Sequence, residues 1–179
     1  NKPGAGQKIG YDYVERTDKP TLLVSTSEIL EFDVLNTVEV LYEFGRFDNL
    51  IFTRAGHYNT LKELINQKEV KFGHGGEGTF SHKSMTEVCK RINCLPVPFK
   101  SGADGMLNLL SDTIDAYALV GYGTNQFLNN IKYKMIGTVS LPNNWLRLYG
   151  KNLSAKDKET IKQILKNTDK SFFRDLGLY

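Results

Sequence analysis

A glycine-rich segment in the centre of the chain has the composition of an anion-binding loop. Residues 73–79 read Gly-His-Gly-Gly-Glu-Gly-Thr and lie between a predicted strand and a predicted helix. Glycines let the backbone approach an anion, and the amides at a helix start point toward its charge. The order G-x-G-x-x-G also suggests a dinucleotide site, which requires an acidic residue about 20 positions further on. Residues 97–100 read Val-Pro-Phe-Lys, without that acid. Carboxylate binding is favoured, and a nucleotide site and a structural turn are the alternatives.

Two other segments have residues suited to ligand contact. Ser25, Thr26 and Ser27 directly follow an apolar run, the position at which open α/β sheets place their ligands. A second glycine-rich turn, at residues 3–10, leads into a predicted helix. Its glycines fit either a second anion loop or a tight turn before the helix.

The histidines do not form a recognisable catalytic group with other residues. His57, His74 and His82 are the three histidines of the chain, and no serine lies in a G-x-S-x-G elbow. His74, inside the glycine-rich loop, is a candidate ligand contact, and His82 lies in the first turn of the following helix. Glu77 would repel a bound carboxylate, so it either points to solvent or meets a cationic group of the ligand. The sequence predicts a binding protein and no enzyme.

The two cysteines do not predict a metal site. Cys89 and Cys94 are five residues apart, a spacing that matches no common zinc pattern and has no nearby histidine pair. We expect no metal and no cofactor. The spacing is compatible with two separate thiols, one on a helix and one entering a strand, or with a disulfide across the turn between them.

Composition excludes several classes of partner. The 23 basic residues barely outnumber the 20 acidic ones and are scattered without interleaved aromatic side chains, so nucleic acid is not expected. The apolar runs are far shorter than the roughly 20 residues that span a bilayer. No signal-peptide pattern precedes the globular part, so we expect any such peptide to have been removed or omitted. The 179 residues suffice for a proper core, in one domain or two small lobes.

Strands and helices alternate along the predicted chain. This alternation indicates βαβ units and mostly parallel sheets flanked by helices, an α/β fold. In the helix at 80–92, apolar residues recur at helical spacing, and Thr60 with Glu63 forms a capping box before another helix. The predicted strands are 21–25, 49–54, 70–73, 95–100, 114–120 and 135–139, and the predicted helices are 9–16, 57–67, 80–92, 103–110, 127–130 and one that begins at 154.

Five motifs in order resemble one family of binding proteins. They are Pro-Gly-Ala-Gly with Ile-Gly at 3–10, Thr-Leu-Leu at 21–23, Leu-Lys-Glu-Leu at 61–64, the loop at 73–82, and Val-Pro-Phe-Lys-Ser-Gly at 97–102. In this order and spacing they are similar to the Bug receptors of the tripartite tricarboxylate transporters, which are type II periplasmic binding proteins. The similarity extends from Asn1 to about Ser140, and more loosely through the C-terminal helix.

This resemblance implies a function and a set of ligand contacts. Bug receptors are periplasmic and lack enzymatic activity, and their two α/β lobes close on a small organic carboxylate that they deliver to membrane transporter subunits. The resemblance therefore implies a monomeric receptor for such an acid. The positions that match the family's ligand contacts are Ser25, Thr26 and Ser27 on one lobe, and Gly76, Gly78, Thr79 and His82 on the other.

The resemblance also suggests how the chain divides into lobes. We expect residues 1–55 and 121–179 to form the first lobe and residues 56–120 the second, with a hinge near 53–56 and 121–125. The family's first strand and its glycine-rich ligand loop, expected before Asn1, are absent from the sequence. Two rival hypotheses are a nucleotide-binding enzyme that uses Gly73–Gly78, and a receptor-derived protein that contacts other proteins without a ligand.

Overall fold

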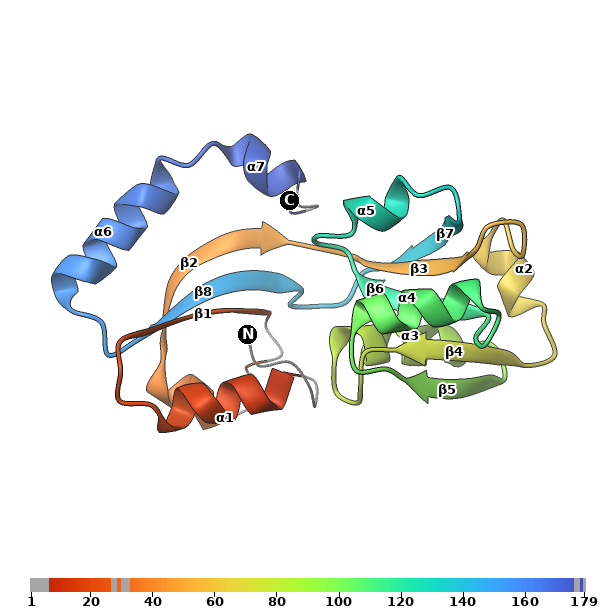
Figure 1. Cartoon of the computed structure of the whole chain (residues 1–179), viewed down its shortest axis with the longest axis horizontal. Coiled ribbons are helices and arrows are strands. Elements are labelled where there is room, and N and C mark those ends of the chain that lie inside the picture. Colours follow the sequence, from red (N-terminus) through yellow and green to blue (C-terminus); the bar gives the residue numbers. More distant parts are fainter. Residues whose placement is uncertain (1–6, 27–28, 30–32, 176–177, 179) are drawn as a thin grey trace.

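The protein contains two β-sheets placed end to end in an elongated molecule (Figure 1). The computed structural model describes residues 7–26, 29, 33–175 and 178. The smaller sheet has three strands in the order β1 (Thr21–Thr26), β8 (Trp145–Lys151) and β2 (Glu39–Arg46). Both neighbouring pairs are antiparallel, so β8, from late in the chain, lies between two early strands.

The larger sheet has five strands and a different pattern. Its order is β5 (Cys94–Pro98), β4 (Val70–His74), β6 (Ala116–Val120), β3 (Asn49–Arg54) and β7 (Tyr133–Val139). β4 is parallel to β5 and β6, whereas β3 is antiparallel to both β6 and β7, so only β3 runs against the other four. The predicted α/β class and mostly parallel sheet are therefore confirmed here. The smaller sheet differs from the expectation, because it is antiparallel throughout.

Hydroxyl side chains set the start of the main helices. Thr60, Thr79, Ser101 and Ser154 each accept a hydrogen bond from the backbone amide three residues on. The cap at Thr60 explains why the helix predicted for 57–67 starts only at Leu61, and this helix ends at Ile65. The helices are α1 (Lys8–Arg16), α2 (Leu61–Ile65), α3 (Phe80–Cys89), α4 (Gly102–Leu110), α5 (Asn125–Leu128), α6 (Ala155–Lys166) and α7 (Lys170–Asp175), with a 3-10 turn at Asp33–Thr37.

Each sheet has its own apolar core. α3 packs on one face of the larger sheet, where Met85 and Val88 belong to the same buried cluster as Ile51 of β3. α4 packs on the opposite face, which receives the alternate residues of β3, as in the contact of Met106 with Phe52. α1 covers one face of the smaller sheet through Tyr11, Val14 and Tyr149. In the part of the chain that the structure describes, no helix has the length and apolar character that crossing a membrane requires.

A third apolar group joins the two sheets, and we call it the junction cluster. The chain crosses between the sheets at 47–48 and at 140–144, where the amide of Phe47 donates to the carbonyl of Asn144 at 3.1 Å. The cluster therefore draws on both sheets and on the C-terminal segment. It consists of Phe47, Phe80, Leu146, Phe173 and Leu178.

The crossing points differ from the expected hinge at 53–56 and 121–125. Thr53 is buried within β3, and its Oγ1 donates to the carbonyl of Asp115 at 3.0 Å. β3 pairs with β6 from Asn49 to Phe52, and β7 pairs with β3. Both β3 and β7 therefore belong to the larger sheet. The expected boundaries at 55/56 and 120/121 placed these two strands with the other sheet. Local sequence could not reveal this, because sheet membership depends on long-range pairing.

The two cysteines form a disulfide, so the alternative of two separate thiols is wrong. Cys89 ends α3, Cys94 begins β5, and their Cα atoms are 5.6 Å apart. Both side chains pack against the core beneath α3. Chain-entropy arguments give a bridge across so short a loop about 2 kcal/mol of stabilisation. We expect the Cys89→Ser/Cys94→Ser double variant to lower the free energy of unfolding by about that amount in urea titrations. An unchanged urea midpoint would contradict this contribution.

Candidate functional site

The predicted loop lies between the end of β4 and the start of α3. Gly76 and Gly78 have positive φ angles of 109° and 79°, a region that side chains disfavour. The backbone therefore turns sharply between His74, the last residue of β4, and Phe80, the first of α3. The conformation of the loop therefore favours glycine at both positions.

Hydrogen bonds between the loop and the first turn of α3 hold the loop in place. Thr79 Oγ1 donates to the carbonyl of Gly76 at 2.7 Å and accepts from the amide of His82 at 3.2 Å. The amide of Gly75 donates to Ser81 Oγ at 3.0 Å, and that hydroxyl donates to the carbonyl of Ala118 in β6. Thr79 thus caps the helix and fixes the loop at the same time.

His74, at the end of β4, and His82, in the first turn of α3, have rings in tilted contact at 43°, and both accept backbone hydrogen bonds from the loop. The amide of Gly76 donates to Nδ1 of His74, and the amide of Gly78 donates to Nδ1 of His82, each at 3.3 Å. The ring centroids are 4.7 Å apart, and His74 is only 2% exposed. Burial is the largest effect and lowers the pKa of His74. The backbone contact with Gly76 raises this pKa, the neighbouring His82 lowers it, and Glu77 raises it.

These contacts change the expected picture of the loop. The amides of Gly75, Gly76 and Gly78 are already hydrogen-bonded within the protein. A carboxylate that used the amides of Gly76 and Gly78 would therefore have to displace the histidines. Buried His74 contacts the loop backbone here, so its predicted contact with a ligand remains a prediction. Glu77 is exposed, which agrees with the alternative that it points to solvent.

Tyr117 of β6 supports the loop from below. A methyl group placed on Gly75 would lie 3.7 Å from the Tyr117 hydroxyl, and one placed on Gly73 would lie 2.6 Å from the ring. Burial raises the pKa of Tyr117 to about 12, well above the ordinary tyrosine value near 10. The phenol is therefore neutral at physiological pH.

The raised pKa of Tyr117 predicts a loss of stability in alkali. Between pH 10 and about 12 the unfolded chain releases this proton and the folded protein keeps it. The free energy of unfolding therefore falls by about 1.4 kcal/mol per pH unit from this residue. Urea titrations at pH 9, 10 and 11 measure the free energy of unfolding of the wild type and of Tyr117→Phe. Above pH 10 this free energy should fall more steeply for the wild type than for the variant. A constant difference would contradict the prediction.

The second group of predicted contacts is described only in part. Ser25 is buried with its Oγ 2.6 Å from the hydroxyl of Tyr11, and it also donates to Gln7 Oε1 at 3.3 Å. Its hydroxyl thus joins β1 to α1. Thr26 is also buried, and Ser27 lies outside the described residues. The role of these three residues in ligand contact remains a prediction.

The two groups border the same junction between the sheets. Thr26, the last residue of β1, pairs in register with Leu146 of β8. Leu146 belongs to the junction cluster together with Phe80, which directly follows Thr79. Figure 1 shows the end of β1 directed toward the part of the molecule that contains α3. A ligand between the sheets would therefore lie near both predicted groups.

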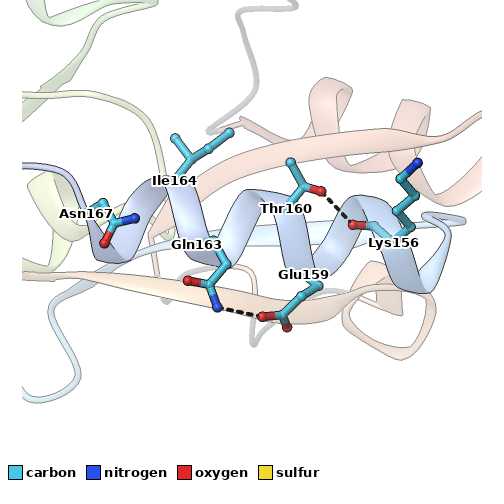
Figure 2. A pocket seen from close by; sticks show the side chains of 6 residues that line it. All are labelled: Lys156, Glu159, Thr160, Gln163, Ile164 and Asn167. Atoms are coloured by element: carbon cyan, nitrogen blue, oxygen red, sulfur yellow. Dashed lines mark hydrogen bonds between the residues drawn. The ribbon is translucent and has the colours of Figure 1, made fainter.

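Two surface hollows lie away from these residues. One, of about 310 Å³, lies between α2, α3 and β7. The other, of about 470 Å³, follows one side of α6, where Gln163 Nε2 donates to Glu159 Oε1 at 2.7 Å (Figure 2). Its most apolar lining residue, Ile164, is 62% exposed. The six residues that line this hollow are Lys156, Glu159, Thr160, Gln163, Ile164 and Asn167.

Solved structures share the fold, although no protein-family model and no curated sequence matches the chain. The periplasmic binding protein BugD aligns with a TM-score of 0.70 and 21% identity, over 98% of this chain and 73% of that one. MatC from Rhodopseudomonas palustris with bound malate gives a TM-score of 0.74 and 14% identity, over 97% and 75%. An R. palustris protein with adipate gives 0.78 and 13%, over 97% and 74%.

These likenesses confirm the fold predicted from the five sequence motifs. In each case nearly all of this chain is matched, with TM-scores well above those of unrelated folds. At identities between 13% and 21% the likeness concerns the fold and not the individual ligand contacts. The chain has the fold of periplasmic binding proteins.

Proposed function

We propose that this protein is a non-catalytic, extracytoplasmic receptor that captures a small organic carboxylate and delivers it to a tripartite tricarboxylate-type membrane transporter. The observation that carries the proposal is the position of the glycine-rich loop at the start of α3, beside the junction of the two sheets. Two of the solved structures with this fold hold malate and adipate, both dicarboxylates, which supports this ligand class.

The charge of the loop suits an anion held by backbone dipoles. Residues 73–82 contain neither Lys nor Arg. α3 has ten residues, and its first turn directs partial positive charge toward the loop. Each loop amide can then donate to a carboxylate oxygen once its present acceptor is displaced. Recognition by amides also fits a receptor that must release its cargo, since no buried ion pair has to be broken.

Closure of two lobes is the mechanism that this fold would supply. We propose that the two sheets are the cores of the lobes and that the crossing segments 47–48 and 140–144 are the hinge. Ser25, Thr26 and Ser27 would contact the ligand from one lobe, and Gly76, Gly78, Thr79 and His82 from the other. A ligand that contacts both lobes favours the closed arrangement.

Thermal unfolding with a panel of ligands tests the proposal. The panel contains malate, adipate, citrate, glutamate, an aromatic acid and a nicotinamide nucleotide. A ligand at 100 times its dissociation constant should add about 2.7 kcal/mol of stability and raise the unfolding temperature by several degrees. A rise with carboxylates supports the receptor. A rise with the nucleotide alone would favour the nucleotide-binding enzyme, and no rise at all would favour a protein-contact role.

A matched pair of glycine variants places the binding at the loop. Gly78 and Gly123 have φ angles of 79° and 71°, and in both cases an added methyl group would meet no atom within 4 Å. Alanine at either position should therefore cost a similar 1–2 kcal/mol of stability through backbone strain. Only Gly78→Ala is expected to weaken carboxylate binding, by about tenfold or 1.4 kcal/mol. Equal binding by both variants would place the ligand elsewhere.

A further inference from the structure

His74 and His82 form a pair of rings in close, tilted contact, and their protonation would change the loop. We propose, on the basis of the receptor function above, that carboxylate binding at this loop is coupled to the uptake of one proton by the histidine pair. The paired contacts of Gly76 and Gly78 carry this inference. Because of this coupling, the affinity of the receptor for the carboxylate should rise as the pH falls.

The hydrogen bonds of the pair exist only while both rings are neutral at Nδ1. Gly76 donates its amide to His74 Nδ1, and Gly78 donates its amide to His82 Nδ1, both at 3.3 Å. A protonated Nδ1 carries a hydrogen and can no longer accept. Protonation of either ring therefore releases one loop amide and adds a positive charge beside it. Both changes favour a bound carboxylate.

The protein surroundings favour the neutral pair in the absence of ligand. His74 is buried, which lowers its pKa, and His82 lowers that pKa further across a centroid distance of 4.7 Å. The backbone contact with Gly76 and the exposed carboxylate of Glu77 act in the opposite direction, but burial is the largest effect and the pKa of His74 is lowered on balance. Two imidazolium rings at this separation would repel each other, so the pair takes up one proton and not two.

The charged and titratable groups on the neighbouring elements do not take up the proton in place of the histidine pair. Tyr117 of β6 has a raised pKa and stays neutral in the relevant range. Lys83 of α3 lies with its Nζ 5.4 Å from the centre of the Phe80 ring. β5 has no charged side chain and is followed by the exposed Lys100, and the single charged residue of α4 is Asp104, which acts on Tyr117.

Linkage fixes the sign of the pH dependence. The carboxylate complex holds one proton more than the free protein, so affinity rises as pH falls. The rise is at most about tenfold per pH unit, over the interval in which the complex is protonated and the free protein is not. Protonation of the ligand's own carboxylates as pH falls removes the negative charge that the loop would bind, so the ligand itself opposes this trend.

Calorimetric titration measures the proton directly. The tightest ligand among malate, adipate, citrate and glutamate is titrated at pH 7 in buffers that differ in ionisation enthalpy. The wild type should take up close to one proton per ligand and bind more tightly at pH 6 than at pH 7. In the double variant His74→Gln/His82→Gln, each side-chain oxygen can still accept from its glycine amide but does not titrate, so proton uptake should be lost. His57→Gln, outside the loop, should behave as the wild type.

The outcomes separate the coupling from the receptor function. Tight carboxylate binding without proton uptake would overturn the coupling and leave the receptor intact. Absence of carboxylate binding at every pH would overturn both. A pH titration with saturating carboxylate adds an independent test: the NMR signals of the histidine pair and of the Gly76 and Gly78 amides should show one protonation step, which moves to lower pH when the ligand is left out. Fixed signals in the wild type would overturn the coupling even if binding varied with pH.

Discussion

Replacing Gly105 by alanine should destabilise the protein by about 3 kcal/mol, although alanine is the better helix former. Gly105 lies inside α4, where an exposed Gly→Ala change would gain up to about 1 kcal/mol. A methyl group at this position would lie 2.1 Å from Cε2 and 2.5 Å from Cζ of Tyr117. Forcing extra volume into a packed core typically costs 1–3 kcal/mol, and more when the neighbour cannot move.

The Tyr117 ring has little room to give way. It is buried, and it also lies close to Gly73, where a methyl group would be 2.6 Å from Cδ2. Gly102→Ala is the matched control, because the nearest atom to its methyl group is the flexible end of Leu119 at 2.7 Å. Urea titration should show a large loss for Gly105→Ala and a small change for Gly102→Ala. A Gly105→Ala variant at least as stable as the wild type would contradict this packing.

Phe47→Ala should cost 3–5 kcal/mol and weaken the connection between the two sheets. Phe47 is fully buried on the first crossing segment, and its ring meets Phe80 and Tyr122 edge to face at 5.6 and 5.1 Å. Removing a buried phenylalanine loses its transfer free energy and leaves a cavity. The edge-to-face contacts add to that loss.

The single tryptophan provides the measurement. Trp145 lies on β8 in the smaller sheet, so its fluorescence follows that sheet, while far-UV circular dichroism follows the whole chain. We expect both signals of Phe47→Ala to shift to lower urea. Phe127→Ala, whose ring meets Tyr133 away from the junction, is the control and should leave the Trp145 signal less affected. A loss below 1 kcal/mol for Phe47→Ala would contradict the role of the junction cluster.

Most elements of the larger sheet could be predicted from local sequence. β4 and β6 are short apolar runs bounded by turns, and the capping threonines before α2 and α3 mark where those helices start. Two strands of the smaller sheet were missed for different reasons. β2 has register shifts near Val40 and Glu43 that break its alternation. β8 reads Trp-Leu-Arg-Leu-Tyr-Gly-Lys, and its alternation could have revealed it.

The candidate site could be located from the sequence, but its internal contacts could not. The glycine pattern and the following helix start placed the loop at 73–79, and the structure has it at 75–79, because Gly73 and His74 end β4. The return of His74 and His82 onto the loop amides depends on the positive φ angles of Gly76 and Gly78 and on the burial of His74. Neither feature can be deduced from residue types alone, because each requires the packing of β6 beneath the loop.

The most direct test of the receptor function is an NMR titration of the labelled protein with malate or adipate. The account predicts saturable shifts of the amide signals of Gly75, Gly76 and Gly78, with smaller changes at the crossing segments as the lobes close. The same titration of Gly78→Ala should need about ten times more ligand. Saturable shifts confined to other regions, such as α6, or the absence of shifts with every carboxylate, would contradict the account.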